Sequence, residues 1–355
     1  MADALKYNVA DVIKCKSCGA DMVFDPASQQ LRCPYCDSTR DIVKRVPHIR
    51  DFASERSAGE VNIDGNIYKC PNCGGETEIQ GFASAVKCPF CGGTNVMKLD
   101  DMKGLKPDSV LPFALTKDTA VDAGRKWIKK KFFAPRKLKK NFTVDNFNGV
   151  YIPSFAFDSD TFSSYEGRFG TDKTRTVHTK DGTRTEHYIE WYRVSGKYSR
   201  GFENTMVEAS TQIHQSELNN ILPFDMNNAT AYTREYLAGF SAERYDTSLD
   251  DSFVTAKNEM DDMIRQDIKN KYNPDHIDYL NVDTTFSNVK FRYTLLPLWI
   301  CGYKFKEKIY RFLVNARTGK ATGTAPKSPL KVAFTTFLII AAIAGLVVAW
   351  YFLRD

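Results

Sequence analysis

The chain has 355 residues, of which 43% are hydrophobic, so it is long enough to bury a core in one large domain or in several small ones. This composition excludes an intrinsically disordered protein. The formal net charge is +6, and any metal-bound thiolates among the nine cysteines would lower it, so charge alone does not indicate nucleic-acid binding.

The first thirty residues decide how the cysteines are interpreted. Nine cysteines would indicate disulfides in a short secreted protein, but residues 1–30 lack the apolar run of a signal peptide. We therefore expect a reducing, cytosolic environment, in which paired cysteines are typical of metal sites.

Two tandem repeats contain eight of the nine cysteines. The first repeat joins Cys15-Lys-Ser-Cys18 to Cys33-Pro-Tyr-Cys36, and the second joins Cys70-Pro-Asn-Cys73 to Cys88-Pro-Phe-Cys91. Fourteen residues separate the two CxxC pairs in each repeat, and the repeats are offset by 55 residues. This match indicates an internal duplication of one unit.

Each repeat is predicted to be a small β zinc ribbon, so that the chain would hold two Zn²⁺ ions. A CxxC turn directs two sulfurs at one point, and Gly19, Gly74 and Gly92 allow the tight turn after the second cysteine. The spacer suits a β-hairpin between the turns. Four sulfur ligands leave no position for water or substrate, which predicts structural sites. Iron in a rubredoxin-like site is the alternative.

The charge of the ribbons argues against DNA or RNA as their partner. Eight thiolates and two Zn²⁺ lower the formal charge of the whole chain to about +2, and each metallated ribbon then carries about −1. Neither ribbon has the basic stripe that phosphate binding needs. The ribbons are therefore predicted to contact other proteins.

A helix is predicted from Thr119 to about Lys131, after a charged, glycine-containing linker over residues 99–109. Thr116 or Asp118 is the candidate N-cap, and a proline at position 135 ends the helix.

The segment 125–140 contains nine basic residues and no acidic one, with Trp127, Phe132 and Phe133 among them. Such a surface suits anionic lipid headgroups or nucleic acid. The alternative is a solvated helix face whose aromatic side chains pack inward. The basic residues are Arg125, Lys126, Lys129, Lys130, Lys131, Arg136, Lys137, Lys139 and Lys140.

Residues 147–204 are predicted to form β-strands because polar and apolar residues alternate. Asp181-Gly182 is typical of a two-residue hairpin turn. Counting outward from that turn places His178 opposite Thr185, with His178 and His187 diagonal on one face. Two histidines without a third ligand make a poor metal site, so both are predicted to be exposed strand residues.

Residues 205–272 are predicted to be helical, and residues 286–324 return to β-strands. Cys301, the odd cysteine, lies in an apolar run and is predicted to be a buried small hydrophobic residue. Tyr151-Ile-Pro-Ser-Phe155 and Leu296-Pro-Leu-Trp299 look like two versions of one strand entry. The clearest helical face consists of Phe253, Ala256, Met260, Met263, Ile264, Ile268 and Tyr272.

The C-terminal segment is predicted to span a membrane. Residues 332–353 contain no charged residue and would form a helix of about 33 Å, against a hydrocarbon core of about 30 Å. Lys320, Lys327 and Lys331 precede this segment. Their positive charge predicts that the large domain lies on the cytoplasmic side of the cell membrane.

Together these features predict an α+β protein in three parts: tandem Cys₄ ribbons over residues 1–100, a mixed α+β cytoplasmic domain over 101–325 and a membrane anchor over 326–355. The order of CPxCG ribbons, the YIPSF strand, the segment 296–323 and a terminal span resembles a family of Gram-positive bacterial zinc-ribbon membrane proteins. Members are labelled as transcription-factor-IIB-type zinc ribbon proteins or, loosely, as primosomal-helicase-like proteins.

The resemblance implies a membrane-anchored cytoplasmic adaptor, since some similar proteins are encoded beside phage-shock protein A and SPFH-domain proteins and recruit them to the membrane. The helicase label conflicts with the sequence. A phosphate-binding loop needs GxxxxGK followed by Ser or Thr, and Gly319-Lys320-Ala321 lacks both the upstream glycine and the hydroxyl.

We therefore predict a zinc-ribbon scaffold that recruits proteins to the inner face of the membrane, in an envelope stress response. SPFH-domain or phage-shock-protein-A-like proteins are the expected partners. The alternative is a membrane-tethered nucleic-acid-binding protein that uses residues 125–140. No catalytic residue is predicted and the protein is not expected to be an enzyme, because the sequence has no HExxH, GxSxG or phosphate-loop motif.

Overall fold

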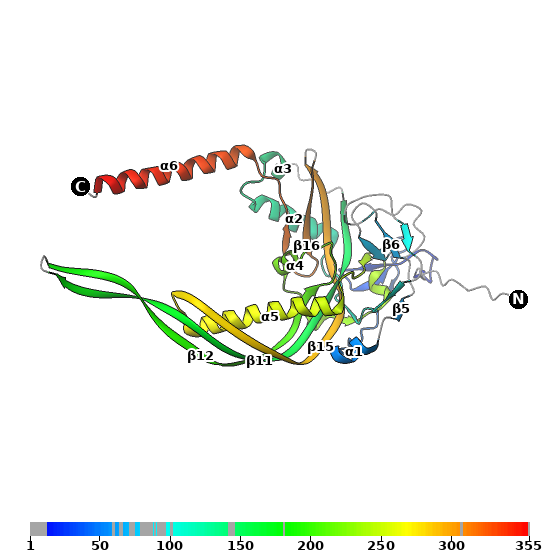
Figure 1. The fold of residues 1–355 in the computed structure, drawn as a ribbon. Coiled ribbons are helices and arrows are strands. Elements are labelled where there is room, and N and C mark those ends of the chain that lie inside the picture. The colour runs from blue at the N-terminus through cyan, green and yellow to red at the C-terminus, as the bar shows by residue number, and fades with distance from the viewer. Residues whose placement is uncertain are drawn as a thin grey trace.

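The computed structural model describes residues 13–58, 61–63, 67–70, 75–78, 88, 90, 97–99, 102–140, 146–179, 182–305 and 308–353. In this part of the chain six α-helices accompany one large sheet and two small ones, which confirms the predicted α+β class. Figure 1 shows a body around the large sheet, a long β arm, and the helix α6 (Pro329–Leu353), which leaves the body on the same side as the arm.

Two long antiparallel strands, β11 (Asn146–Thr179) and β15 (His276–Phe305), form the centre of the structure. Their pairing runs from Asn146 opposite Gly302 to Gly170 opposite His276. Ile152 lies opposite Leu296, so the two proline-containing motifs face each other in mid-strand and are not strand entries. Both motifs are buried, because the two strands carry the apolar core of the body.

Shorter strands extend this central pair into the large sheet. Strand β14 links β11 to β7, while β16 and β17 continue the sheet beyond β15. The chain turns at Asn315–Gly319 between β16 and β17, with Gly319 at φ +75°. These strands are β4 (Arg50–Asp51), β6 (Ile67–Lys69), β7 (Glu76–Glu78), β8 (Met97–Leu99), β10 (Ser109–Val110), β13 (Thr230–Ala231), β14 (Ser241–Glu243), β16 (Lys308–Asn315) and β17 (Ala321–Gly323).

The predicted linker over residues 99–109 is not an unstructured connection. It contains β9 (Met102–Gly104), which pairs with β5 (Val61–Ile63), and the start of β10. Ser109 of β10 lies opposite Thr294 in a parallel pairing with β15, and their hydroxyl groups are 2.7 Å apart. Strand pairing with a distant segment therefore overrides the polar composition that indicated a linker.

The arm is a hairpin of β11 with β12 (Gly182–Glu208), and it continues as two strands beyond the start of β15. The prediction of the hairpin is confirmed, but the predicted register is wrong by two residues. His178 lies opposite Thr183, and His187 lies opposite Thr174. The reason is that Gly182 is the first residue of β12, paired with Thr179, and does not occupy the turn.

The helix α2 (Lys117–Lys130) confirms the predicted helix with Thr116 as its N-cap, whose side chain accepts a hydrogen bond from the Thr119 amide. The helical prediction for residues 205–272 holds only for α4 (Gln215–Ile221) and α5 (Leu249–Tyr272). The remaining residues form the end of β12, the strands β13 and β14, two short 3₁₀ turns and irregular connections, because strand pairing competes with helix formation. The other helices are α1 (Phe52–Ala58) and α3 (Arg136–Lys140).

Helix α5 covers the face of the sheet where the arm leaves the body (Figure 1). The predicted apolar face is confirmed for Ala256, Met260, Ile264 and Ile268, which are fully buried. Met263 is the exception, since 39% of it is exposed at the edge of the contact.

Met260 and Met263 form a matched pair for testing this packing. Met260→Ala removes a fully buried side chain, and we expect the free energy of unfolding to fall by about 2–5 kcal/mol. Met263→Ala should change it by less than about 1 kcal/mol, because its side chain is already partly exposed at the edge of the contact. Thermal unfolding of the full chain in detergent measures both. Equal destabilisation by the two variants would show that α5 is not seated as described.

Candidate functional site

Four sulfur atoms from two turns form a cluster in the N-terminal sheet of β1 (Val23–Asp25), β2 (Gln30–Arg32) and β3 (Thr39–Arg40). The β1–β2 hairpin lies between the two CxxC turns. The Sγ atoms of Cys15 and Cys36 are 3.6 Å apart, and those of Cys18 and Cys33 are 3.5 Å apart. A tetrahedral Zn²⁺ site with bonds of about 2.3 Å separates its sulfurs by about 3.8 Å, so the cluster could bind one ion.

The two CxxC turns repeat the same backbone hydrogen bonds. In each, the amide of the first cysteine donates to the carbonyl five residues later, at 2.7 Å for Cys15 and 2.9 Å for Cys33. The residue after the second cysteine has a positive φ in both turns, +75° at Gly19 and +58° at Asp37. Asp37 thus occupies a position that Gly fills elsewhere, which its short polar side chain tolerates.

The electrostatics of the cluster favour a thiolate at Cys15 and at Cys36. The pKa of Cys18 is raised instead, because hydrogen bonds with the neighbouring cysteine thiols outweigh the opposite effect of the Ala20 amide. Backbone amides of Cys18 and Ser17 hold the pKa of the Cys15 thiol at about 6. The hydroxyl and amide of Ser38 lower the pKa of Cys36. Since metal ions bind the thiolate and not the thiol, these groups prepare the cluster for a soft metal such as zinc, or iron as the alternative.

The second repeat keeps three features of the first at the same offset. The amide of Cys70 donates to Gly75 O at 3.0 Å, as that of Cys15 does to its own turn. Lys69 pairs with Glu76 across the turn with an ion pair of 3.0 Å, and Lys14 pairs with Asp21 in the same way. Cys70 and Cys88 are each 1% exposed. The other two cysteines, at positions 73 and 91, lie outside the described residues.

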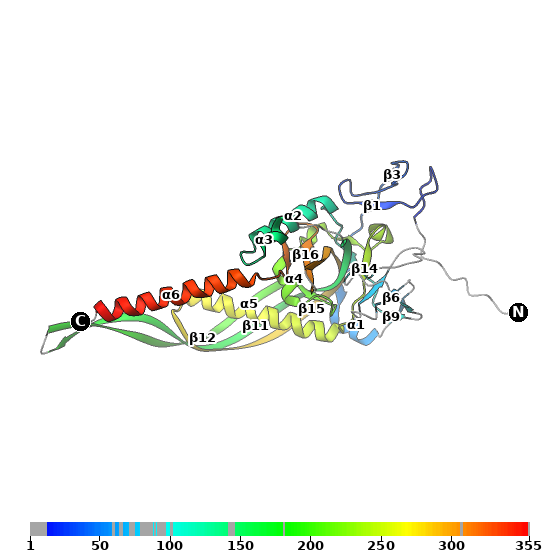
Figure 2. The same ribbon diagram turned by 90° about the horizontal axis from the view of Figure 1, so that it is seen from above.

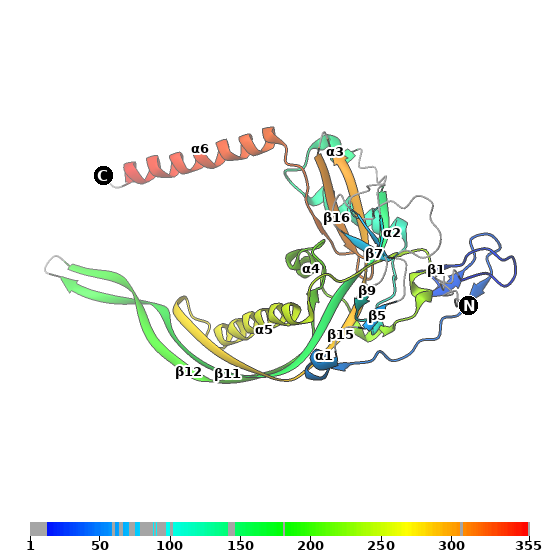
Figure 3. The same cartoon turned by 45° about the vertical axis from the view of Figure 1, so that its right-hand side comes forward.

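The four-cysteine cluster is fixed to the body through Phe24 of β1, which is 2% exposed. The Phe24 amide donates to Ala238 O at 2.8 Å, and its ring centroid lies 5.4 Å from that of Tyr236. Gln29 reaches further and donates to Phe113 O at 2.6 Å. Figure 3 shows this sheet on the side of the body opposite to the arm and α6.

The basic segment 125–140 forms a corner between α2 and α3. Some of its side chains pack inward, and others are exposed as a binding surface would require. Trp127 packs inward and stacks on Phe312 with ring centroids 5.6 Å apart, whereas Phe132 is 66% exposed. Arg125 pairs with Asp122 at 3.0 Å. The exposed basic residues are Arg125, Lys126, Lys129, Lys130, Lys131, Arg136, Lys137 and Lys140, and Lys139 is half-buried.

This corner holds the start of α6. The Ser328 amide donates to Phe133 O at 2.8 Å, and Lys331 Nζ donates to the carbonyl oxygens of Phe132 and Ala134, each at 2.9 Å. Figure 2 shows α6 running outward from α3. The predicted basic segment and the predicted membrane helix, which are separate in sequence, are therefore adjacent in space.

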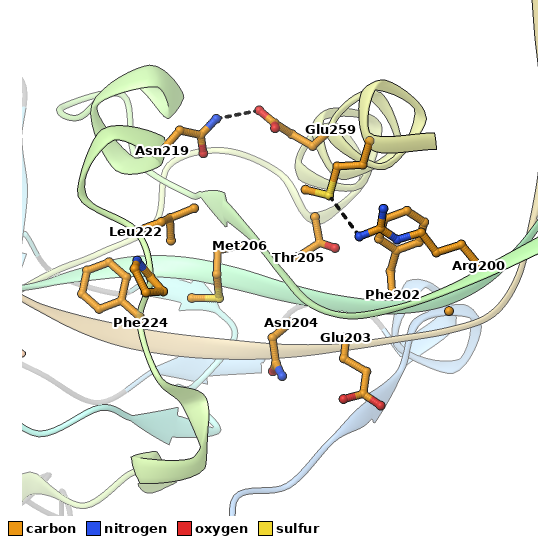
Figure 4. Close-up of a pocket in the computed structure, with 13 residues that line it drawn as sticks. Arg200, Phe202, Glu203, Asn204, Thr205, Met206, Asn219, Leu222, Phe224 and Glu259 are labelled. Carbon is orange, nitrogen blue, oxygen red and sulfur yellow. Dashed lines mark hydrogen bonds between the residues drawn. The ribbon is translucent and has the colours of Figure 1, made fainter. Parts of the chain in front are cut away.

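A pocket of about 270 Å³ lies between α4, β12 and α5 (Figure 4). Apolar side chains such as Leu222 and Phe224 line one end. At the other end the polar groups already have partners, because Asn219 donates to Glu259 at 2.9 Å and the Arg200 guanidinium lies 3.9 Å from Met263 Sδ. This satisfied lining indicates packing between the elements.

Two buried carboxyl groups face the core, and the sequence did not reveal them. Glu208 at the end of β12 is 7% exposed, and among the described residues its oxygens have no side-chain hydrogen-bond partner. Glu243 of β14 is 3% exposed and accepts from the Ser210 hydroxyl. Burial raises the pKa of Glu243 to about 8. Burial and the neighbouring Glu243 also raise that of Glu208. Glu243 is therefore protonated at neutral pH, and burial favours the neutral form of Glu208 as well.

The fold and the cluster define an α+β protein with a four-cysteine group that could bind one metal ion and a helix long and apolar enough to span a membrane. The chain is similar to "Uncharacterized protein YdjG" of Bacillus subtilis (strain 168), with 29% identity over 330 residues that cover 90% of this chain and 91% of that protein. No family model and no solved structure matches the chain.

Metal analysis of the purified full chain tests both cysteine repeats. We expect about two Zn²⁺ per chain, and about one after either Cys15→Ser or Cys70→Ser, because loss of one thiolate opens a four-sulfur site. Cys301→Ala is the control, since this buried cysteine belongs to neither repeat, and it should leave the zinc content unchanged. Unaltered zinc in Cys70→Ser would show that the second repeat holds no metal.

Glu243→Gln should make the protein more stable at alkaline pH. Folding raises the pKa of Glu243 from 4.5 to about 8. Its contribution to stability is therefore full below about pH 4.5 and is lost as the pH rises towards 8. Gln still accepts from Ser210 but never ionises. We expect the Tm of the wild type to fall relative to that of the variant between pH 6 and pH 9.

Glu203→Gln is the matched control for this measurement, because Glu203 lies on β12 of the same large sheet and is exposed. Its Tm difference from the wild type should stay constant over the same range. A constant difference for Glu243→Gln as well would contradict the assignment of Glu243 as a buried neutral acid.

Proposed function

We propose that the protein is a single-span membrane scaffold whose zinc ribbons and α+β body bind partner proteins at the cytoplasmic face. The exposure of α6 carries this proposal. No residue of Pro329–Leu346 is buried, and large apolar side chains such as Phe334, Phe337 and Ile343 point outward around the helix. A continuous apolar surface of this size is unfavourable in water, and a hydrocarbon layer would cover all its sides at once.

The lysines at the start of α6 orient the proposed span. Lys327 and Lys331 flank the first turn of the helix, and Lys320 lies just before β17. Positive residues next to a span are retained on the cytoplasmic side. The body and the ribbons would then be cytoplasmic, which agrees with unoxidised cysteines as metal ligands.

A bilayer would require α6 to point away from the arm. Beyond Gly170 the arm has two strands with unpaired edges and charged side chains such as Arg175 and Glu186, which hydrocarbon does not accommodate. Figure 1 shows α6 and the arm leaving the same side of the body. Residues 324–328, which have no regular secondary structure, are the joint at which the helix would turn.

We assign a structural Zn²⁺ ion to each cysteine repeat and a binding role to the ribbons. The equivalent backbone hydrogen bonds of Cys15 and Cys70, and the equivalent ion pairs of the lysines that precede them, support a duplicated site. A closed four-sulfur site leaves no coordination position for substrate, which favours binding over catalysis. Around the first ribbon Tyr35, Val43 and Val46 are exposed apolar side chains, and such surfaces suit a protein partner.

Deletion of residues 332–353 tests the anchor. We expect the truncated chain to move almost completely from the membrane fraction to the soluble fraction, together with any co-purifying proteins, because the apolar surface of α6 is gone. Replacement of the same residues by an unrelated single-span helix is the matched control and should restore membrane association. If the truncated chain resists alkaline extraction from membranes, α6 is not the anchor.

A further inference from the structure

The corner between α2 and α3 is positively charged, and few carboxylates neutralise it. Among the described residues, the only carboxylate partner in this corner is Asp122, which pairs with Arg125. Two lysines bind backbone carbonyls instead: Lys139 donates to Lys129 O, and Lys331 donates to Phe132 O in the segment that follows α2. Neighbouring positive charges repel one another, so a bound anion would stabilise a cluster of cations that lacks carboxylate partners.

The corner also has the shape of a binding site. A cavity of about 330 Å³ lies between residues 131–134 and residues 323–327, with Lys131 and Lys327 among its lining residues. Phe132 borders it, and the ring centroids of Phe132 and Phe133 are 5.1 Å apart. Lys331 Nζ lies 5.7 Å from the centre of the Phe132 ring. Cations and an exposed aromatic ring thus converge on one opening.

We propose that this corner is a binding site for the headgroup of an anionic phospholipid, with the cations around the cavity contacting the phosphate and Phe132 seated at the level of the acyl-chain boundary. This assignment rests on the proposed membrane anchoring by α6. Lysine and arginine recognise phosphate by charge, and aromatic side chains concentrate at the interface between headgroups and hydrocarbon. The combination fits a lipid better than it fits a nucleic-acid backbone.

Chain connectivity keeps the corner at headgroup depth whatever direction α6 takes. Helix α2 contacts β16 and β17, and Trp127 and Ile128 anchor it to the body. Five residues, 324–328, connect β17 to α6, and they span at most about 17 Å. The corner therefore stays beside the first turn of the span. A DNA or RNA duplex bound at the corner would have to fit into the space between the corner and the bilayer surface.

The test uses the purified full chain in mixed micelles of a neutral detergent. Phosphatidylglycerol or phosphatidylcholine is titrated in, and bound lipids are counted by native mass spectrometry. We expect the wild type to bind phosphatidylglycerol at least tenfold more tightly than phosphatidylcholine. In the triple variant Lys130→Glu, Lys137→Glu and Lys327→Glu, which includes an exposed lysine that lines the cavity, this preference should fall at least tenfold, because each basic residue near an anionic lipid surface contributes about fivefold.

The triple variant avoids Lys131, which packs over the Trp127 ring, so it should fold. The control Lys44→Glu, Lys106→Glu and Arg193→Glu changes the net charge equally at exposed sites elsewhere and should alter the preference less than twofold. An equal loss in the control would overturn the site. So would binding of glycerol phosphate as tight as that of the lipid, or corner-dependent binding of a DNA duplex without lipid preference.

Incorporation of the wild type into nanodiscs of phosphatidylcholine alone is measured separately. If the chain stays soluble without detergent and does not enter nanodiscs, the proposed anchor fails, whereas the lipid titration still reports on the corner. Loss of lipid preference with normal incorporation would overturn the headgroup site and leave the anchor in place.

Discussion

The antiparallel pairing of β11 with β15 is the interaction on which the rest of the structure depends. Within the body it joins β14 and the second cysteine repeat on one side to β16, β17 and the start of α6 on the other. Outside the body the same two strands continue with β12 as the arm. A shift of one residue in this pairing would turn buried Phe155 and Phe157 to the opposite face, so the core fixes the register.

The same sheet separates the two candidate sites. The four-cysteine cluster is coupled to β15 through packed aromatic rings, since Phe24 contacts Phe240, Phe240 stacks on Phe113 and Phe113 contacts Trp299. The corner at α6 meets the other end of the sheet through Trp127 and Phe312. A partner bound at the ribbon would be held away from the bilayer by a packed, rigid body. Such an arrangement suits a scaffold.

Local chemistry explains which features the sequence predicted. The CxxC turns, the Thr116 cap and the apolar length of α6 depend on residues close together in the chain, and the structure places all three as expected. Long-range pairing explains the failures. Nothing near Thr205 or Glu208 indicates that they continue a strand, because their partners lie in β11. In the sequence, Glu208 and Glu243 look like ordinary acidic residues. Only the strand pairing of the sheet shows that both are buried. The apolar neighbours Met206 and Val207 were the local signal that Glu208 is buried.

The position of the basic corner follows from the different environments of its two neighbours, the apolar helix α6 and the charged arm. Helix α6 is apolar on every side and needs hydrocarbon, whereas the arm is charged and needs water. Both join the body within the same sheet, so in the proposed membrane-anchored arrangement the boundary between lipid and water would pass close to the joint at residues 324–328. The exposed lysines of the corner and Phe132 lie there. A surface that pairs cationic groups with an aromatic ring is stable at that boundary and poorly matched to either solvent alone.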